Sequence, residues 1–258
     1  MNSFYYFAVF VFGLIVGSFL NCVIYRLEIG RVRQLADLRG RSFCPGCKHK
    51  LGFWDLVPVF SFLFLKGRCR YCQKPISWQY PLVELATGLL FVLATLEITT
   101  MVAIQSFYYF VLICFLIVIF VYDLKHYLIP DFVVYSAIAL TFVYLICWRW
   151  DLEHIWAALG LAGFFLAIVL VSREKWMGLG DVKLGFLIGL ILGWPGTLLA
   201  VFLATSLGAI IGIGLIVAGK KKMKSEVPFG PFLVMGTLVA LFWGEKIINW
   251  YVQIFYFN

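Results

Sequence analysis

The chain has 258 residues, of which 63% are hydrophobic and only 13% are charged, and its formal net charge is +8. A soluble domain of this length does not carry so large an apolar share, whereas a protein that crosses a membrane several times must. The basic residues are not interleaved with polar sequence as in a soluble nucleic-acid-binding domain, so we expect membrane lipids and no nucleic acid among the partners.

Eight apolar runs follow one another and predict an all-α polytopic membrane protein with about eight transmembrane helices. They cover residues 4–25, 81–98, 102–122, 132–148, 155–171, 184–192, 197–218 and 232–250. Read as one helix, the sixth and seventh runs would be roughly 50 Å long, too long for one crossing of a core about 30 Å thick. We therefore expect two crossings with a turn at Trp194-Pro195-Gly196.

The placement of the Lys and Arg residues supports eight spans. If the segment after the first span is cytoplasmic, only Arg149 and Lys246 of the 21 basic residues fall outside the inner loops. Seven spans would move Lys220, Lys221, Lys222 and Lys224 to the opposite side. The positive-inside rule thus predicts a multi-pass protein of the cytoplasmic (inner) membrane with both termini outside.

The first apolar run is expected to be a membrane span and not a cleaved signal, because no positive region precedes it and its charges follow it. Gly13 and Gly17 form a G-x-x-x-G motif, which is typical of a helix-packing face. We expect Asn21, in the same helix, to form a hydrogen bond with a neighbouring helix.

Two C-x-x-C motifs lie in the one large polar segment, after the first span. Cys44 and Cys47 form the first, and Cys69 and Cys72 form the second. Four thiolates at this spacing can close tetrahedrally around a zinc ion, and a full shell of four leaves no open position, so the zinc would be structural. Two disulfides are the alternative, which a reducing cytoplasm disfavours.

The apolar segment between these motifs, Phe53 to Leu65, is too short and too interrupted to cross a membrane. We expect it to lie at the membrane interface or to pack on the helix bundle. Asp55, within this segment, is expected to cap a helix or to pair inside the cysteine module.

Two aspartates stand where expected spans meet the cytoplasm. Asp123 ends the third span, and Asp181 begins the sixth span within Gly178-Leu179-Gly180-Asp181. Ionisable groups near the membrane core are candidate functional groups. Two close carboxylates that share a proton are the groups an aspartic peptidase uses. A helix cap for Asp181 and a charge at the span boundary for Asp123 are the simpler alternatives.

Other polar residues near these ends have structural interpretations. We expect Asp131 to cap the fourth span, and Lys183 either to anchor in the headgroup region or to pair with a carboxylate. Glu84 is expected to form a packing hydrogen bond or to line the site. His126 is a lone histidine in a turn, with little to indicate catalysis.

Several separated motifs together resemble the bacterial type IV prepilin peptidases, membrane aspartic proteases of the G-x-G-D class. They run in the family's order over nearly the whole chain: Gly17-Ser18-Phe19-Leu20-Asn21 with Tyr25-Arg26, both cysteine pairs, Gly67-Arg68, Tyr80-Pro81-Leu82-Val83-Glu84, Asp123 with Ile129-Pro130-Asp131, Gly180-Asp181-Val182-Lys183 and Pro228-Phe229-Gly230-Pro231-Phe232. One departure is Glu28, where the family often has proline.

The resemblance implies that Asp123 and Asp181 are the catalytic pair, facing the cytoplasm and cutting the basic leader of prepilins or pseudopilins. It further implies N-methylation of the new N-terminal residue with S-adenosylmethionine, an activity tied to the cysteine segment. The domains expected are then a first transmembrane helix (1–25), a cytoplasmic zinc module (26–80) and a peptidase domain (81–258). No glycine fingerprint for the methyl donor is present, so its site stays unassigned, as do the pilin system and the oligomeric state.

Two other functions stay open. An ion-coupled transporter could use Asp123, Asp181 and Glu84, although carboxylates nearer the middle of spans would favour it more. A zinc-stabilised membrane scaffold would explain the cysteines but would give both aspartates no role.

Overall fold

A computed structural model describes residues 3–30, 42–97, 103–148, 151–219 and 227–256. These residues form helices and short loops, with isolated β-bridges in the cysteine module. Within these described ranges, seven helices are long and apolar enough to cross a membrane, which confirms the all-α polytopic class. The chain divides into two compact units, residues 1–118 and 119–258, and the division falls inside one helix, α4 (Ala103–His126).

In the first unit, α1 (Ser3–Glu28) packs closely on α3 (Gln79–Glu97). A Cβ added at Gly17 would lie 2.7 Å from the Cα of Glu84, and Gly13 approaches α3 equally closely. The prediction of a packing face is therefore confirmed. Asn21 is buried and donates from its side-chain amide to the carbonyl of Tyr80 at 3.1 Å, which confirms the expected interhelical hydrogen bond.

Between α1 and α3 lies the cysteine module, in which the segment from Phe53 to Leu65 forms two short helices. These are the 3₁₀ helix η2 (Phe53–Asp55) and α2 (Phe60–Phe64). Neither approaches the length of about 20 residues that a membrane crossing needs, as expected.

The second unit contains α5 (Asp131–Trp148), α6 (Leu152–Ser172), α7 (Leu179–Val217) and α8 (Gly230–Tyr256). Local sequence explains two of these helix starts. Pro130 directly precedes α5, where its fixed φ suits a helix start. Asp151 caps α6 by accepting the backbone N–H of Glu153 at 2.9 Å.

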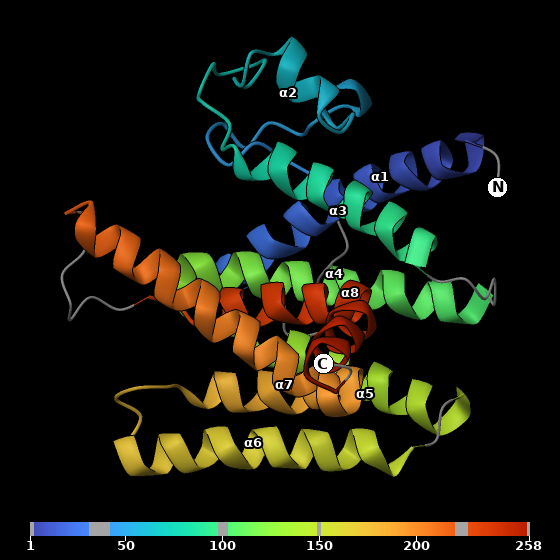
Figure 1. Ribbon diagram of the computed structural model, residues 1–258. Coiled ribbons are helices and arrows are strands. Elements are labelled where there is room, and N and C mark those ends of the chain that lie inside the picture. Colours follow the sequence, from blue (N-terminus) through green and yellow to red (C-terminus); the bar gives the residue numbers. More distant parts are fainter. Residues whose placement is uncertain (1–2, 31–41, 98–102, 149–150, 220–226, 257–258) are drawn as a thin grey trace. The chain divides into compact units, whose positions relative to one another are not determined.

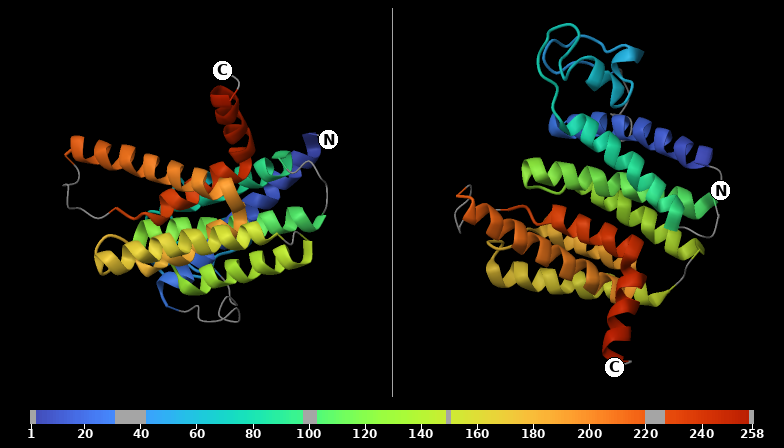
Figure 2. Two further views of the ribbon diagram at one scale, coloured as in Figure 1. Left: turned by 60° about the horizontal axis from the view of Figure 1, so that its bottom comes forward. Right: turned by 45° about the horizontal axis from the view of Figure 1, so that its top comes forward.

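Helix α7 is broken at the position where the sequence predicts a turn. Gly193 (φ 60°, ψ −167°) and Trp194 (φ −91°, ψ 146°) are not helical, and Pro195 follows them. Figures 1 and 2 show that the second arm of α7 runs back toward the side on which the first arm began. One of the seven candidate spans, α7, therefore contains both arms that the sequence predicts as the sixth and seventh crossings. The Lys220–Lys224 cluster lies outside the described residues.

Both arms of α7 pack against neighbours through glycines. Gly189 on the first arm lies against the backbone of Ala158 in α6, and Gly236 in α8 lies against the carbonyl of Ala200 on the second arm. A side chain at either glycine would overlap backbone atoms, so these contacts bring the three helices close together.

Candidate active site

Asp123 lies in the last turn of α4 and is 5% exposed. Its carboxylate accepts the backbone N–H of Gly230, the first residue of α8. A Cβ added at Gly230 would collide with Oδ2 of Asp123. The start of α8 can therefore approach the carboxylate this closely only because residue 230 has no side chain.

Asp181 is the third residue of α7 and is half-buried. Its Oδ2 accepts the backbone N–H of Gly178 at 3.4 Å, so the expected capping contact is present. The same carboxylate is close enough to Asp123 for the charge of Asp123 to act on it. Asp181 can therefore cap the start of α7 and lie near Asp123 at the same time.

Ile129, in the short loop between α4 and α5, packs between the two helix starts. A Cβ added at Gly180 would lie 3.2 Å from its Cβ, and one added at Gly230 would lie 3.4 Å from its Cδ1. The starts of α7 and α8 thus converge on the end of α4 around a single aliphatic side chain. Each helix start carries a partial positive charge of roughly half a unit, which is directed at a carboxylate.

Asp131 forms an ion pair with a lysine. Its Oδ1 lies 2.6 Å from Nζ of Lys183, and the ammonium also lies 5.2 Å from the ring centre of Tyr135. Of the two alternatives for Lys183, the pairing with a carboxylate is confirmed. Asp131 stands in the first turn of α5 and is largely exposed.

The four cysteines form a second candidate site, in the first unit. The sulfur atoms of Cys44, Cys47, Cys69 and Cys72 all lie within 4.8 Å of one another, and those of Cys44 and Cys72 are 3.9 Å apart. Tetrahedral zinc with Zn–S bonds of about 2.3 Å would hold its sulfurs about 3.8 Å apart. The four thiols therefore fit a zinc ion, and they are not paired as disulfides.

The two cysteine motifs fold alike. In the first, the N–H of Cys44 donates to the carbonyl of His49 at 2.9 Å, and in the second the N–H of Cys69 donates to that of Lys74 at 2.9 Å. An isolated antiparallel bridge closes each motif. These repeated turns point the two pairs of thiols at a common centre.

The environment of the thiols gives them different pKa values. Burial acts to raise the pKa of Cys44, but backbone N–H groups of its own motif and hydrogen bonds with other thiols outweigh it and lower the pKa to about 7. The N–H of Lys74 acts to lower the pKa of Cys72, but burial and hydrogen bonds with the other three thiols raise it to about 11. Bound zinc requires all four as thiolates.

Asp55 and Glu84 both form contacts that stabilise the cysteine module. Asp55 accepts the N–H of Gly52 at 3.1 Å and lies 2.8 Å from Nε of Arg70, which confirms its expected role inside the module. Glu84 is buried in α3, and its Oε2 accepts the N–H of Val59 at 2.8 Å. The prediction of a packing hydrogen bond is thus confirmed for Glu84.

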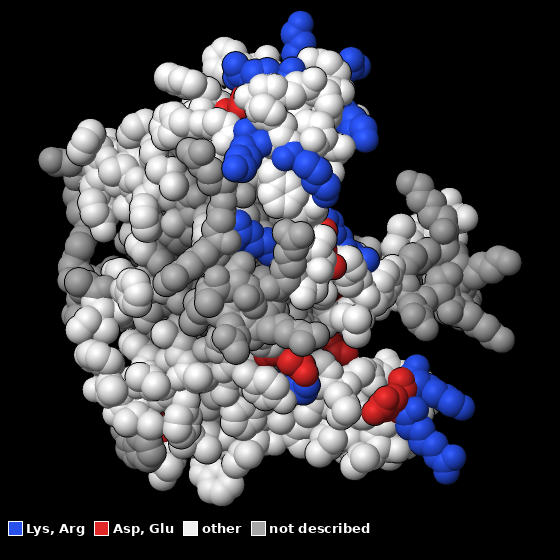
Figure 3. Space-filling view, turned by 180° about the vertical axis from the view of Figure 1, so that it is seen from behind, with Lys and Arg blue, Asp and Glu red and all other residues white. Residues whose placement is uncertain are grey.

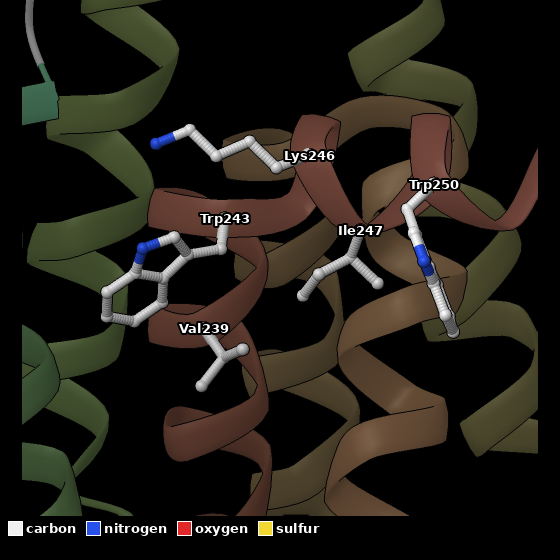
Figure 4. Close-up of a pocket in the computed structure, with 5 residues that line it drawn as sticks. All are labelled: Val239, Trp243, Lys246, Ile247 and Trp250. Atoms are coloured by element: carbon white, nitrogen blue, oxygen red, sulfur yellow. The ribbon is translucent and has the colours of Figure 1, made fainter.

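A hollow of about 380 Å³ lies along α8, away from the two aspartates. Figure 4 shows its lining side chains, all from α8: Val239, Trp243, Lys246, Ile247 and Trp250. Val239 is already about 13 Å along the helix from Gly230 at 1.5 Å per residue. None of the five is acidic, so the hollow adds nothing to the carboxylate chemistry.

Comparison with known proteins decides the family. A family model described as the bacterial peptidase A24 N-terminal domain matches residues 11–98, and one described as the type IV leader peptidase family matches residues 110–213. The chain belongs to the type IV leader peptidase family. The two models together include both aspartates and all four cysteines.

Curated relatives of this type IV leader peptidase family member are similar over nearly their full lengths. A protein of Aeromonas salmonicida (strain A449) is 34% identical over 289 residues, which cover 96% of this chain and 94% of the relative. Proteins of Legionella pneumophila and Bacillus subtilis (strain 168) are each 33% identical and cover 96% and 95% of this chain, and 95% and 96% of the relatives. All three are named prepilin leader peptidase/N-methyltransferase. No solved structure matches the chain.

The sequence did not predict a role for two residues that lie next to the aspartates of this leader peptidase family member. Gly230 stands out there only as part of Pro228-Phe229-Gly230-Pro231-Phe232, and Ile129 only as part of Ile129-Pro130-Asp131. Their contacts join segments about 50 to 100 residues apart. The glycine and prolines just before the last apolar run were the one sequence feature that could have drawn attention to Gly230.

Proposed function

We propose that this chain cleaves the basic leader of type IV prepilins or pseudopilins at the cytoplasmic face of the inner membrane, and then N-methylates the new N-terminal residue. The observation that carries the proposal is the approach of Asp123 and Asp181 at the ends of two membrane helices. The names of the curated relatives supply the substrate class and the second activity.

Cleavage in this proposal uses the aspartates as an acid and a base. One carboxylate removes a proton from water as the water oxygen attacks the scissile carbonyl, and the other, protonated, donates its proton to the amide nitrogen that leaves. Two neighbouring carboxylates hold a single proton because two adjacent like charges are unfavourable, so the pair titrates as a unit. The N–H of Gly230 keeps the Asp123 carboxylate oriented.

The location of the aspartates suits a substrate that is itself a membrane helix. A prepilin has its charged leader on the inside, so its scissile bond lies where the helix leaves the bilayer. Asp123 in the last turn of α4 and Asp181 in the first turn of α7 would lie at that depth. Cleavage there requires the substrate helix to unwind locally.

Zinc and a methyl donor complete the proposed cofactors. The four cysteine thiolates would hold zinc, which cross-links the two motifs of the module and leaves no position for substrate. S-adenosylmethionine would supply the methyl group, by analogy with the N-methyltransferase name of the relatives. We assign no residues to its site.

The transporter alternative finds no support. Glu84, one of its three ion-binding candidates, forms a hydrogen bond with the backbone of Val59. The relatives, which are matched over more than nine-tenths of their lengths, carry the name of a peptidase and methyltransferase.

The test is to incubate membranes containing the protein with a prepilin and to determine the mass of the mature N-terminus. We expect loss of the leader and a gain of one methyl group, the gain depending on added S-adenosylmethionine. Leader removal without the methyl gain would refute the second activity alone, and an uncut prepilin would refute both.

A further inference from the structure

The cysteine module exposes large apolar side chains on its two short helices. Its aromatic face, defined by Phe53, Trp54, Phe60, Leu63 and Phe64, has exposed fractions of 78%, 75%, 56%, 61% and 82%. So many large apolar side chains exposed within residues 53–64 are unfavourable in water, and exposed apolar surface marks sites where a partner or a membrane binds.

Two contacts place α2 beside the first turns of α3. The N–H of Val59, which precedes α2, donates to Glu84, about 8 Å along α3 from its first residue. The ring of Phe62 packs on that of Trp78, with centroids 4.9 Å apart. Helix α3 has 19 residues, about 28 Å, and needs nearly all of that length to cross a core of about 30 Å.

The backbone also places the module beside the start of α3. Figure 1 and the right-hand view of Figure 2 show the module alongside the first half of α3. The conformation of Val59 fixes α2 there, because its φ of 62° is one that a β-branched residue rarely adopts and the buried Glu84 carboxylate holds its N–H. Because α2 is anchored about 8 Å along a helix that needs nearly its whole length to cross, the aromatic face lies at the boundary between the headgroups and the acyl chains of a bilayer around α3.

The charge of the module matches an anionic membrane surface. Figure 3 shows Lys and Arg side chains gathered over it. Between residues 42 and 78 the one acidic residue is Asp55, which Arg70 neutralises, and the basic residues are Lys48, Lys50, Lys66, Arg68, Arg70 and Lys74. All of these basic residues are exposed, and Lys66 and Arg68 directly follow α2. A basic peptide would be repelled by this surface, whereas anionic headgroups would be attracted.

We propose that the aromatic face of the cysteine module inserts into the cytoplasmic leaflet and that Lys66 and Arg68, which directly follow α2, bind anionic lipid headgroups. Aromatic side chains favour the interface between headgroups and acyl chains, and a basic rim adds electrostatic attraction. The membrane thus covers the apolar surface that the module leaves open and holds the module beside α3.

The experiment uses the full chain with an environment-sensitive fluorescent amino acid in place of Phe64. A matched control carries the same probe in place of Lys74, which is exposed on the second cysteine motif. Each protein is reconstituted in vesicles of phosphatidylethanolamine and phosphatidylglycerol. Nitroxide-labelled lipid reports contact with the bilayer, and iodide reports contact with water. Zinc content checks that each labelled module has folded, and a probe in place of Phe60 replaces the one at position 64 if that module has not folded.

We expect nitroxide lipid to quench the probe at position 64 several-fold more than the probe at position 74, and iodide to show the reverse order. Lys66→Glu with Arg68→Glu should lower the quenching at position 64, as should replacing phosphatidylglycerol with phosphatidylcholine. A probe at position 64 that iodide quenches freely would overturn the proposal. So would a probe shielded from both quenchers, because a protein surface would then cover the face.

Discussion

The absence of one side chain brings the start of α8 into contact with a buried carboxylate. Gly230 donates its N–H to Asp123 and leaves no room for a Cβ beside Oδ2. The alanine substitution would push either the carboxylate or the helix start out of position. In active sites, a displacement of about 1 Å can lower the rate about 100-fold.

We therefore predict that Gly230→Ala lowers prepilin cleavage about 100-fold while the protein still inserts and folds. The measurement is the initial rate of cleavage in membranes that hold equal amounts of each variant. Gly212→Ala is the matched control, because a Cβ at Gly212 meets nothing within 4 Å. Equal rates for Gly230→Ala and the wild type would show that this contact does not orient Asp123.

At the residue scale, the sequence singles out Asp123 and Asp181 as candidates because charge is rare in apolar helices and both stand at expected span ends, and their catalytic role stays a prediction. It could predict the four cysteines because their spacing is local. The contacts of Gly230 and Ile129 could not be predicted, since they depend on the tertiary approach of three helix ends. The bond between Glu84 and the backbone of Val59 likewise depends on how the module folds back on α3.

At the scale of elements, α7 shows how a local conformation separates two helical arms. Gly193 has φ 60° and ψ −167°, a region that only glycine adopts readily, and its Cα faces the ring of His154. The sequence predicted the turn here because one helix of this length would exceed the bilayer. The packing of His154 against the break was not predictable, because His154 lies in another helix.

We predict that Gly193→Ala destabilises the folded protein by about 1–3 kcal/mol, because alanine in this backbone region is strained. The measurement is the midpoint of thermal unfolding in detergent. Gly163→Ala in α6 should leave the midpoint nearly unchanged, because a Cβ there meets nothing within 4 Å and its φ is not positive. Equal midpoints for the two variants would mean that the break relaxes without strain.

For the cysteine module, we predict that Cys44→Ser releases zinc, whereas Cys147→Ser, outside the cluster, retains it. Zinc binding should also weaken as the pH is lowered, because protons compete with the metal for every thiolate, and it should weaken more steeply below about 7, where the Cys44 thiolate is protonated as well as that of Cys72. Metal analysis after dialysis at several pH values measures both effects. Retention of zinc by Cys44→Ser, or tighter binding in acid, would contradict a four-thiolate site.

At the scale of the whole molecule, the membrane explains the order of the motifs. The first unit carries the cysteine module between two helices, and the second carries both aspartates at helix ends. With eight crossings, the positive-inside rule puts the module, both aspartates and Asp131 on the cytoplasmic side. That orientation and the three-domain division (1–25, 26–80, 81–258) remain predictions.

The measurement that tests the central claim most directly is the rate of prepilin cleavage by Asp123→Asn and Asp181→Asn. Asp131→Asn is the control, since its largely exposed carboxylate pairs with Lys183 and an ion pair at the protein surface usually contributes less than about 1 kcal/mol. We predict that each of the first two substitutions lowers the rate by about 100- to 10,000-fold and that the control keeps most of its activity. Cleavage near the wild-type rate by Asp123→Asn or Asp181→Asn, in protein that has inserted normally, would contradict the shared-proton mechanism.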